Sequence, residues 1–341
     1  MAFDRLILPD GRYWVERQTL HRLQAGRDLV TNAADVGCGE RLARTASRDS
    51  DASGASNADE CGSSGPMMRF AQSAHQHPTG HPTLVAFGGI DYGKFPAAED
   101  GNRGAAMNRR LRAEHGKFSV LPHTGREVSA ILREYRANTG QPAKAWYGKE
   151  AGEGRLKSLL SPTARPPRVL HLATHGFFLS NKGGEGAPRP DRPMALGGLA
   201  LAGANRGMGG KTGPDGEDGV LYALEAQSLN LQGTELVVLS ACDTGKGEID
   251  YSDGVYGLTR AFRIAGAGNV LMTLWPLDDA LAREFMADFY CNWLGGERRK
   301  RCQGVPLPPA EALRQTRLAW IKSDDERRRD PKYWAPYVLV E

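Results

Sequence analysis

The chain of 341 residues lacks several features that would place it in a particular class of protein. Its apolar runs are far shorter than the roughly 20 residues that a membrane-spanning helix needs. No apolar segment follows Met1 in the manner of a secretory signal peptide. The net charge is only +4, from 44 basic and 40 acidic residues. These absences predict a cytoplasmic protein with no membrane partner and no nucleic-acid partner.

Cysteine is also scarce, with five in the whole chain, no CxxC pair and no spacing typical of a disulfide scaffold. An odd count in a long chain fits a reducing compartment. Glycines crowd residues 207–219, but neither a P-loop nor a dinucleotide-binding pattern is present. We therefore expect no cofactor and interpret this stretch as a mobile loop at the rim of whatever site the domain carries.

The composition divides the chain into three parts. Residues 1–31 alternate short apolar clusters with a turn and predict a β-hairpin. Residues 32–82 are rich in small and polar residues and predict a disordered insertion or linker. Residues 83–341 show strand and helix patterns in alternation. We expect one large domain there.

Short apolar runs alternate with amphipathic patterns through that domain. Thr124 and Glu127 have the spacing of a capping box, and a helix is expected to follow them. Strands are predicted at 84–88, 168–173, 235–241, 269–275 and 337–340, and further helices at 220–230, 253–266, 278–294 and 308–322. This alternation predicts an α/β sandwich with a mostly parallel central sheet.

Two of the predicted strands end in residues with nucleophilic or acid–base chemistry. One strand ends in His175-Gly176, and another ends in Cys242. In parallel sheets the reacting groups collect at the carboxyl ends of the strands, so neighbouring strands would bring both side chains to one edge. A nearby imidazole can activate a thiol, and the N–H groups of Gly176 and Cys242 are suited to stabilise an oxyanion. Either residue alone would more often be structural. For the two together at matching strand ends, a catalytic role and a structural role are equally supported by the residues alone.

Other candidate sites carry a simpler explanation. His75, His77 and His81 lie in a polar stretch without a further ligand and are interpreted as part of a solvated linker, so no metal is expected. His115-Gly116 repeats the His-Gly pair but follows no buried strand, and we interpret it as a decoy. His123 precedes a helix and is expected to be structural.

The sequence around both strand ends resembles the CHAT domain, a family of bacterial caspase-like and separase-like cysteine peptidases. The matching blocks lie at 171–178, 198–205, 218–225, 235–245, 254–262, 274–279 and 333–338. The resemblance covers roughly residues 84–341. It implies a caspase-like three-layer α/β sandwich, no metal, and hydrolysis of peptide bonds through an acyl-enzyme at Cys242 with His175 as acid and base.

The resemblance also implies a preference for a basic P1 residue of a protein substrate. Asp278 or Asp279 lies where separase-like relatives carry a selecting aspartate, and a carboxylate there suits an arginine side chain. Both residues are equally suited to cap the following helix, and Asp243 is a weaker pocket candidate.

Relatives often carry tetratricopeptide repeats upstream, and no 34-residue period is visible in this sequence. A tetratricopeptide-repeat or other regulatory partner is therefore expected. The chain begins close to a block that lies inside the domain in relatives. The first strand of the domain is therefore expected to be missing or supplied elsewhere. The alternative is a catalytically silent interaction module.

Overall fold

The computed structural model describes most of the chain beyond residue 81. The described residues are 82–94, 106–179, 196–241, 251–275, 277–295 and 304–341, without the side chains of 241, 251–256 and 279. Several expectations fall outside them, namely the hairpin at 1–31, the insertion at 32–82 apart from residue 82, the three-histidine cluster, Cys242, Asp243 and the Asp279 side chain.

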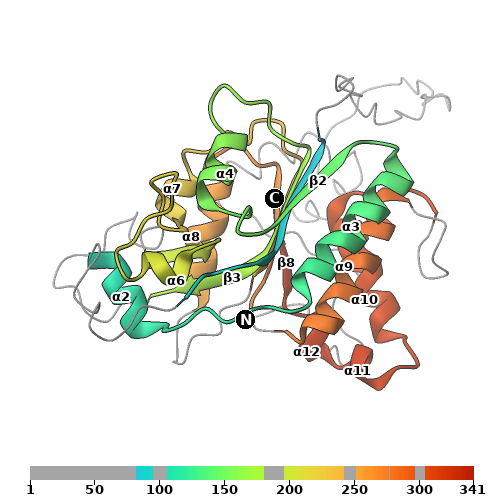
Figure 1. Cartoon of the computed structure of the whole chain (residues 1–341). Coiled ribbons are helices and arrows are strands. Elements are labelled where there is room, and N and C mark those ends of the chain that lie inside the picture. The colour runs from blue at the N-terminus through green and yellow to red at the C-terminus, as the bar shows by residue number, and fades with distance from the viewer. Residues whose placement is uncertain (1–81, 95–105, 180–195, 242–250, 276, 296–303) are drawn as a thin grey trace, which may run out of the picture. The chain divides into compact units, whose positions relative to one another are not determined.

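A mixed sheet forms the centre of the described domain (Figure 1). Its main strands are ordered β2-β1-β3-β6-β7-β8, parallel throughout except for β8, which runs antiparallel to β7. Two short strands, β4 and β5, continue from the end of β3 in antiparallel pairing. The strands are β1 (Leu84–Ile90), β2 (Ala143–Gly148), β3 (Val169–Phe178), β4 (Gly197–Ala200), β5 (Val220–Tyr222), β6 (Leu236–Ala241), β7 (Asn269–Thr273) and β8 (Tyr337–Val340).

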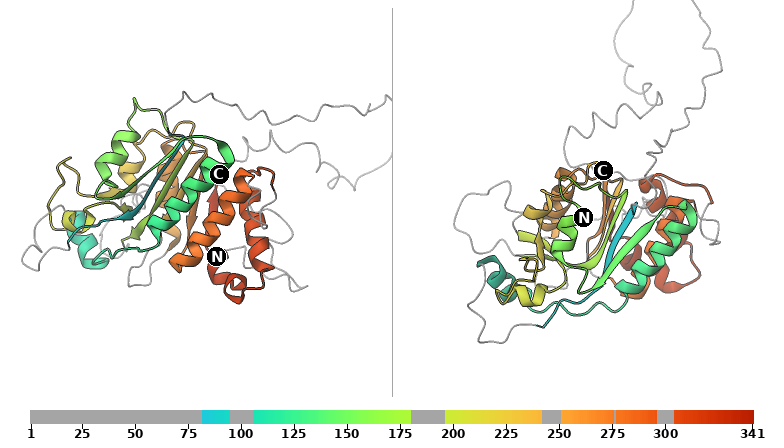
Figure 2. Two further views of the ribbon diagram at one scale, coloured as in Figure 1. Left: turned by 45° about the vertical axis from the view of Figure 1, so that its right-hand side comes forward. Right: turned by 45° about the horizontal axis from the view of Figure 1, so that its top comes forward.

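Helices cover both faces of the sheet. Figures 1 and 2 show α3, α9 and α10 on one face and α4, α7 and α8 on the other. The helices are α2 (Ala106–Glu114), α3 (Thr124–Thr139), α4 (Glu153–Leu159), α6 (Ala204–Gly207), α7 (Ala223–Ala226), α8 (Tyr251–Ile264), α9 (Asp279–Leu294), α10 (Pro309–Ile321), α11 (Glu326–Arg329) and α12 (Pro331–Trp334). This is the three-layer α/β sandwich with a mostly parallel sheet that the sequence predicts.

Alternating side chains of the strands divide the core into two clusters. In β1, Leu84 and Ala86 join the cluster that includes α3, α9 and α10. Val85 and Phe87 point the other way, into the cluster on the opposite face. Because the sheet is buried on both sides, its central strands are apolar almost without interruption, which is why the sequence identifies them so clearly.

The capping box predicted at the start of α3 is wrong. Thr124 is the first residue of the helix, and His123 at the N-cap position makes no side-chain capping bond. The Thr124 hydroxyl instead accepts a hydrogen bond from the N–H of Gly89, at 3.0 Å. The Glu127 carboxylate is buried and lies 3.0 Å from Nε2 of His171 in β3. Thr124 and Glu127 thus bond to the sheet and do not cap the helix, because this end of α3 packs directly on β1 and β3.

The helix predicted at 220–230 is also only partly correct. Residues Val220–Tyr222 form strand β5, and only the single turn of α7 follows. The pairing of β5 with β4 decides this, because a strand partner distant in the sequence outweighs the local helical pattern.

Cys291 shows chemistry that the cysteine spacing did not indicate. It lies fully buried on α9 and is disulfide-bonded. The other four cysteines of the chain lie outside the described residues. Among the described helices, none is both long and apolar enough to cross a membrane.

Candidate active site

The parallel pairing of β3 with β6 ends part-way along β3, which continues past His175 to Phe178, so the strand end predicted at His175 is wrong. The two strands pair in parallel over six residues, and the last pair joins Thr174 to Ala241. Beyond Thr174, β3 leaves β6 and pairs with β4, beginning with His175 opposite Ala200. The change of partner occurs at His175, which therefore lies where the parallel sheet ends.

The imidazole of His175 is held in an aromatic surrounding. Its side chain is 2% exposed, and its ring lies 5.1 Å from the ring of Tyr92 and 5.5 Å from that of Phe118, between centroids. Nε2 lies 2.7 Å from the backbone oxygen of Ser119. A carbonyl oxygen can only accept, so Nε2 carries the hydrogen, and in the neutral ring Nδ1 is the basic nitrogen. The surroundings thus fix both the orientation and the tautomer of His175.

Asn205 holds the segment that orients His175. Its Oδ1 accepts from the N–H of Phe118 at 2.9 Å, and its Nδ2 donates to the oxygen of Phe118 at 2.9 Å. The same Nδ2 donates to the oxygen of Gly93 at 3.1 Å. Asn205 is 1% exposed, so these bonds are shielded from water. One side chain therefore ties together the two segments that contact the imidazole.

His115, which the sequence suggested was a decoy, lies beside this site. Its ring is 4.4 Å from that of Phe118 and 6.5 Å from that of His175, between centroids. Burial lowers the pKa of His115, which favours the neutral ring. The local pattern gave no reason to expect His115 beside His175, because His115 follows helix α2 and not a strand.

The remaining predicted site residues are positioned differently. Gly176 lies in β3 opposite Leu199 of β4. Asp278 is the N-cap of α9, and its carboxylate accepts from the N–H groups of Ala280 and Leu281 at 3.1 Å each. The capping alternative therefore describes Asp278 in this structure. Cys242, Asp243 and the side chain of Asp279 lie outside the described residues.

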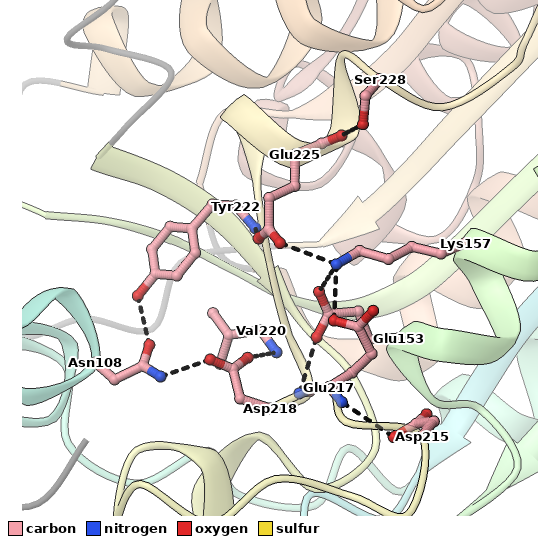
Figure 3. Close-up of polar contacts among 11 residues, drawn as sticks. Asn108, Glu153, Lys157, Asp215, Glu217, Asp218, Val220, Tyr222, Glu225 and Ser228 are labelled. Carbon is pink, nitrogen blue, oxygen red and sulfur yellow. Dashed lines mark hydrogen bonds and ion pairs between the residues drawn. The ribbon is translucent and has the colours of Figure 1, made fainter. Parts of the chain in front are cut away.

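A cluster of carboxylates lies on the face of the sheet that carries α4 and α7 (Figure 3). Glu153, Glu217 and Glu225 converge on the ammonium group of Lys157, at 2.7, 2.8 and 2.9 Å. Three carboxylates at such spacing could hold a metal ion, but the lysine takes the central position. Burial raises the pKa of the Glu153 carboxyl to about 8, and the bonds to Lys157 oppose this only in part.

The same network holds the loop at 207–219, which the sequence suggested was mobile. Asp218 accepts from Nδ2 of Asn108 in α2 at 2.6 Å, and the Tyr222 hydroxyl donates to Oδ1 of Asn108 at 2.9 Å (Figure 3). The N–H of Gly219 donates to the Glu153 carboxylate at 2.9 Å. The end of the loop is therefore joined to two helices by buried or half-buried bonds.

Comparison with known proteins identifies relatives of the chain and the family to which it belongs. The chain is 31% identical over 121 residues to tetratricopeptide repeat protein 28 of Mus musculus, and equally to that of Homo sapiens. That region is 36% of this chain but only 4% of either relative. A crystal structure titled as the Arg specific cysteine proteinase gingipain R aligns with a TM-score of 0.40 and 6% identity, over 76% of this chain and 46% of that one. The family model described as the CHAT domain matches residues 1–341, and the chain belongs to this family.

Proposed function

We propose that this CHAT domain is a cysteine endopeptidase in which Cys242 is the nucleophile and His175 is its acid and base. The observation that supports it most is the end of the β3–β6 pairing. Thr174 and Ala241 are in register, and His175 and Cys242 are the residues that follow them in the sequence. Two parallel strands in this register bring the residues that follow them to the same edge of the sheet.

In the proposed reaction, Nδ1 of His175 takes the proton of the Cys242 thiol as the sulfur attacks the scissile carbonyl carbon. The oxyanion receives hydrogen bonds from the N–H groups of Gly176 and Cys242. The imidazolium then gives its proton to the leaving amine, and an acyl-enzyme remains on sulfur. Water, deprotonated by the same imidazole, hydrolyses the thioester and restores the thiol.

The natural substrate in this proposal is a protein cleaved after a basic residue. Asp278 already accepts two N–H bonds at the start of α9, which leaves less of its carboxylate for a substrate. We therefore assign the P1 selection first to Asp279 and then to Asp243. A bidentate pair with an arginine side chain would favour arginine over lysine at P1.

The setting that we propose is cytoplasmic, with a tetratricopeptide-repeat or other regulatory partner. The two curated relatives are named as tetratricopeptide repeat proteins, which supports the kind of partner. The balanced charge of +4 supports the view that nucleic acid is not a partner.

The second candidate is a catalytically silent interaction module. The observation that favours it is the burial of His175, which is only 2% exposed and is covered by the rings of Tyr92 and Phe118. A peptide must reach the acid–base group during hydrolysis, and a permanently covered imidazole would prevent this.

A thiol-directed peptide probe separates the two candidates. The peptidase predicts that the probe modifies Cys242 selectively and that Cys242→Ala abolishes the modification. His175→Ala should slow it by about a hundredfold or more, since the thiol loses its base. His123→Ala is the matched control, because His123 is the N-cap of α3 and not part of the site. If the probe labels the His175→Ala and His123→Ala variants equally, the peptidase proposal is rejected and the silent module is retained.

Cleavage-site profiling with a peptide library tests the P1 assignment. Cleavage after arginine should dominate, and Asp279→Asn should reduce it by tenfold or more through kcat/KM, by loss of a charge-assisted bond of about 1.5–3 kcal/mol. Asp278→Ala, which removes the acceptor that caps α9, is the matched control for a loss caused by helix capping. A library profile without a basic preference would reject the P1 assignment and leave the catalytic pair untouched.

A further inference from the structure

A concave site lies beside α3, and none of the residues that line it is assigned to hydrolysis. It is a cavity of about 580 Å³ formed by one face of α3, the end of β2 and the first turns of α9. The residues that line it are Pro122, Gly125, Arg126, Ser129, Arg133, Tyr147 and Arg283. Three of them are arginines and none is acidic.

None of the three arginines is paired with an acidic residue that the structure describes. Within the part of the chain that the structure describes, the side chains of Arg126, Arg133 and Arg283 make no hydrogen bond and no ion pair. Among the described residues some other arginines are paired, as Arg168 is with Glu235 at 2.5 Å, while Arg155 and Arg165 are not. What distinguishes Arg126, Arg133 and Arg283 is that all three line one cavity. Three guanidinium groups around one cavity repel one another, and an anion between them would remove that repulsion.

Two hydroxyl groups complete the polar lining. The Ser129 hydroxyl donates to the backbone oxygen of Gly125 at 2.8 Å and lies 3.1 Å from the hydroxyl of Tyr147. Tyr147 is 39% exposed, so its hydroxyl can also meet a ligand. The cavity opens along the first turns of α3, and the positive end of that helix adds to the charge of the arginines.

We propose that this cavity binds a compact, multiply charged anion that carries phosphate groups. Guanidinium groups bind phosphate oxygens through two parallel N–H bonds, and hydroxyl groups supply further donors. The volume lies within the range of small-molecule sites, and the apolar groups of the lining are few, namely Pro122 and the ring of Tyr147, beside three arginines. The site goes beyond peptide hydrolysis and does not depend on Cys242.

Calorimetric titration of the full chain with inorganic tripolyphosphate, in about 0.15 M salt, tests the proposal. We expect one binding site per chain, weakened about tenfold or more in Arg126→Ala/Arg133→Ala, because two charge-assisted contacts are lost. Arg155→Ala/Arg165→Ala removes the same charge from two exposed arginines outside the cavity and should bind as the unchanged chain does. Equal weakening in both double variants would overturn the proposal, since it would show only a general attraction between charges.

Two further measurements define the ligand. Arg283→Lys keeps the charge but loses the guanidinium fork, and it should still weaken tripolyphosphate binding severalfold. Citrate should bind much more weakly than tripolyphosphate, and equal affinity would overturn the assignment to phosphate. A phosphoserine peptide that displaces tripolyphosphate would identify a modified protein as the source of the phosphate, and failure of the peptide alongside binding of tripolyphosphate would identify a free small molecule.

Discussion

At the scale of single residues, the surroundings of His175 depend on a side chain that performs no chemistry. Asn205 bonds the N–H and the oxygen of Phe118, and through them it positions the ring and the carbonyl that orient the imidazole. Asparagine alone supplies both a donor and an acceptor at this length, so no other residue of similar size satisfies both groups.

Asn205→Ala should lower the free energy of unfolding by about 2–4 kcal/mol, because two buried backbone groups lose their partners. The measurement is urea unfolding. Asn138→Ala is the matched control, since Asn138 bonds only the half-buried carboxylate of Glu134 and its loss should cost about 0.5 kcal/mol or less. If the two variants unfold at the same urea concentration, Asn205 does not hold the segment at Phe118.

The residues of the candidate site differ in how far the sequence could predict them. His175 follows an apolar run and a specific motif, but it does not end its strand, because β3 continues to Phe178 and only the pairing partner changes at His175, from β6 to β4. His115 carries the same His-Gly pair without a strand, and only the course of α2 in space brings it within 6.5 Å of His175. Long-range placement of this kind leaves no trace in local spacing. Asn205 stands in a block that matched the family, but its bonding partners could not be named.

At the scale of secondary-structure elements, α3 is fixed to the sheet through a buried polar chain. The carboxylate of Glu127 lies 3.0 Å from Nε2 of His171, and Nδ1 of that ring lies 3.2 Å from the hydroxyl of Tyr290 in α9. Burial raises the pKa of Tyr290 well above its usual range, so its hydroxyl keeps its proton. Three elements are thereby joined across one face of the sheet.

Glu127→Ala should cost about 2–4 kcal/mol in unfolding free energy, because a buried ring nitrogen loses its partner and a cavity is left. Glu127→Gln keeps the hydrogen bond and should cost clearly less. If Glu127 only capped the helix, both substitutions would instead lower the free energy of unfolding slightly and by similar amounts. Chemical denaturation of the two variants beside the unchanged chain provides the measurement.

The ordered loop at 207–219 makes a second prediction about an element. A methyl group at Gly207 would lie 1.9 Å from the backbone oxygen of Asp218, which cannot move without disturbing the bond to Asn108. Gly207→Ala should therefore destabilise the fold by about 3 kcal/mol or more. Gly216→Ala is the matched control, because its positive φ of 84° costs only about 1–2 kcal/mol and its surroundings are open. Equal melting temperatures of the two variants would show that the loop is free to shift.

Strands were easier to predict than helix boundaries for a physical reason. The apolar runs at 84–88, 169–173 and 236–239 are buried on both faces of a parallel sheet, so nearly every position in them is apolar and the run is easy to identify. The start of α3 and the division of 220–230 into β5 and α7 depend on packing partners far away in the sequence. A local motif such as the capping box could not distinguish these cases.

At the scale of the whole molecule, the two faces of the sheet carry different charge chemistry. The face with α3 and α9 bears three arginines around one cavity, and none of them is paired with a residue that the structure describes. The face with α4 and α7 bears the cluster of Glu153, Glu217 and Glu225 around Lys157. The small net charge of +4 hides this arrangement, so composition alone could not predict either site.

The carboxylate cluster predicts how the stability of the domain depends on pH. The pKa of Glu153 is raised by burial from 4.5 to about 8, while the groups that face it are Lys157, Glu217, Glu225 and Asp218. Between these two pH values the folded chain holds a proton that the unfolded chain has released. The contribution of Glu153 is therefore fully present below about pH 4.5 and is lost as the pH rises through 8.

Glu153→Gln removes this titration and keeps an acceptor for the N–H of Gly219. The unfolding free energy of the unchanged chain, relative to the variant, should fall between pH 5 and 8 with a slope of at most about 1.4 kcal/mol per pH unit. Urea unfolding at four pH values in this window measures the difference. Parallel curves would mean that Lys157 keeps Glu153 ionised at neutral pH, with the ion pair outweighing the burial of the carboxylate.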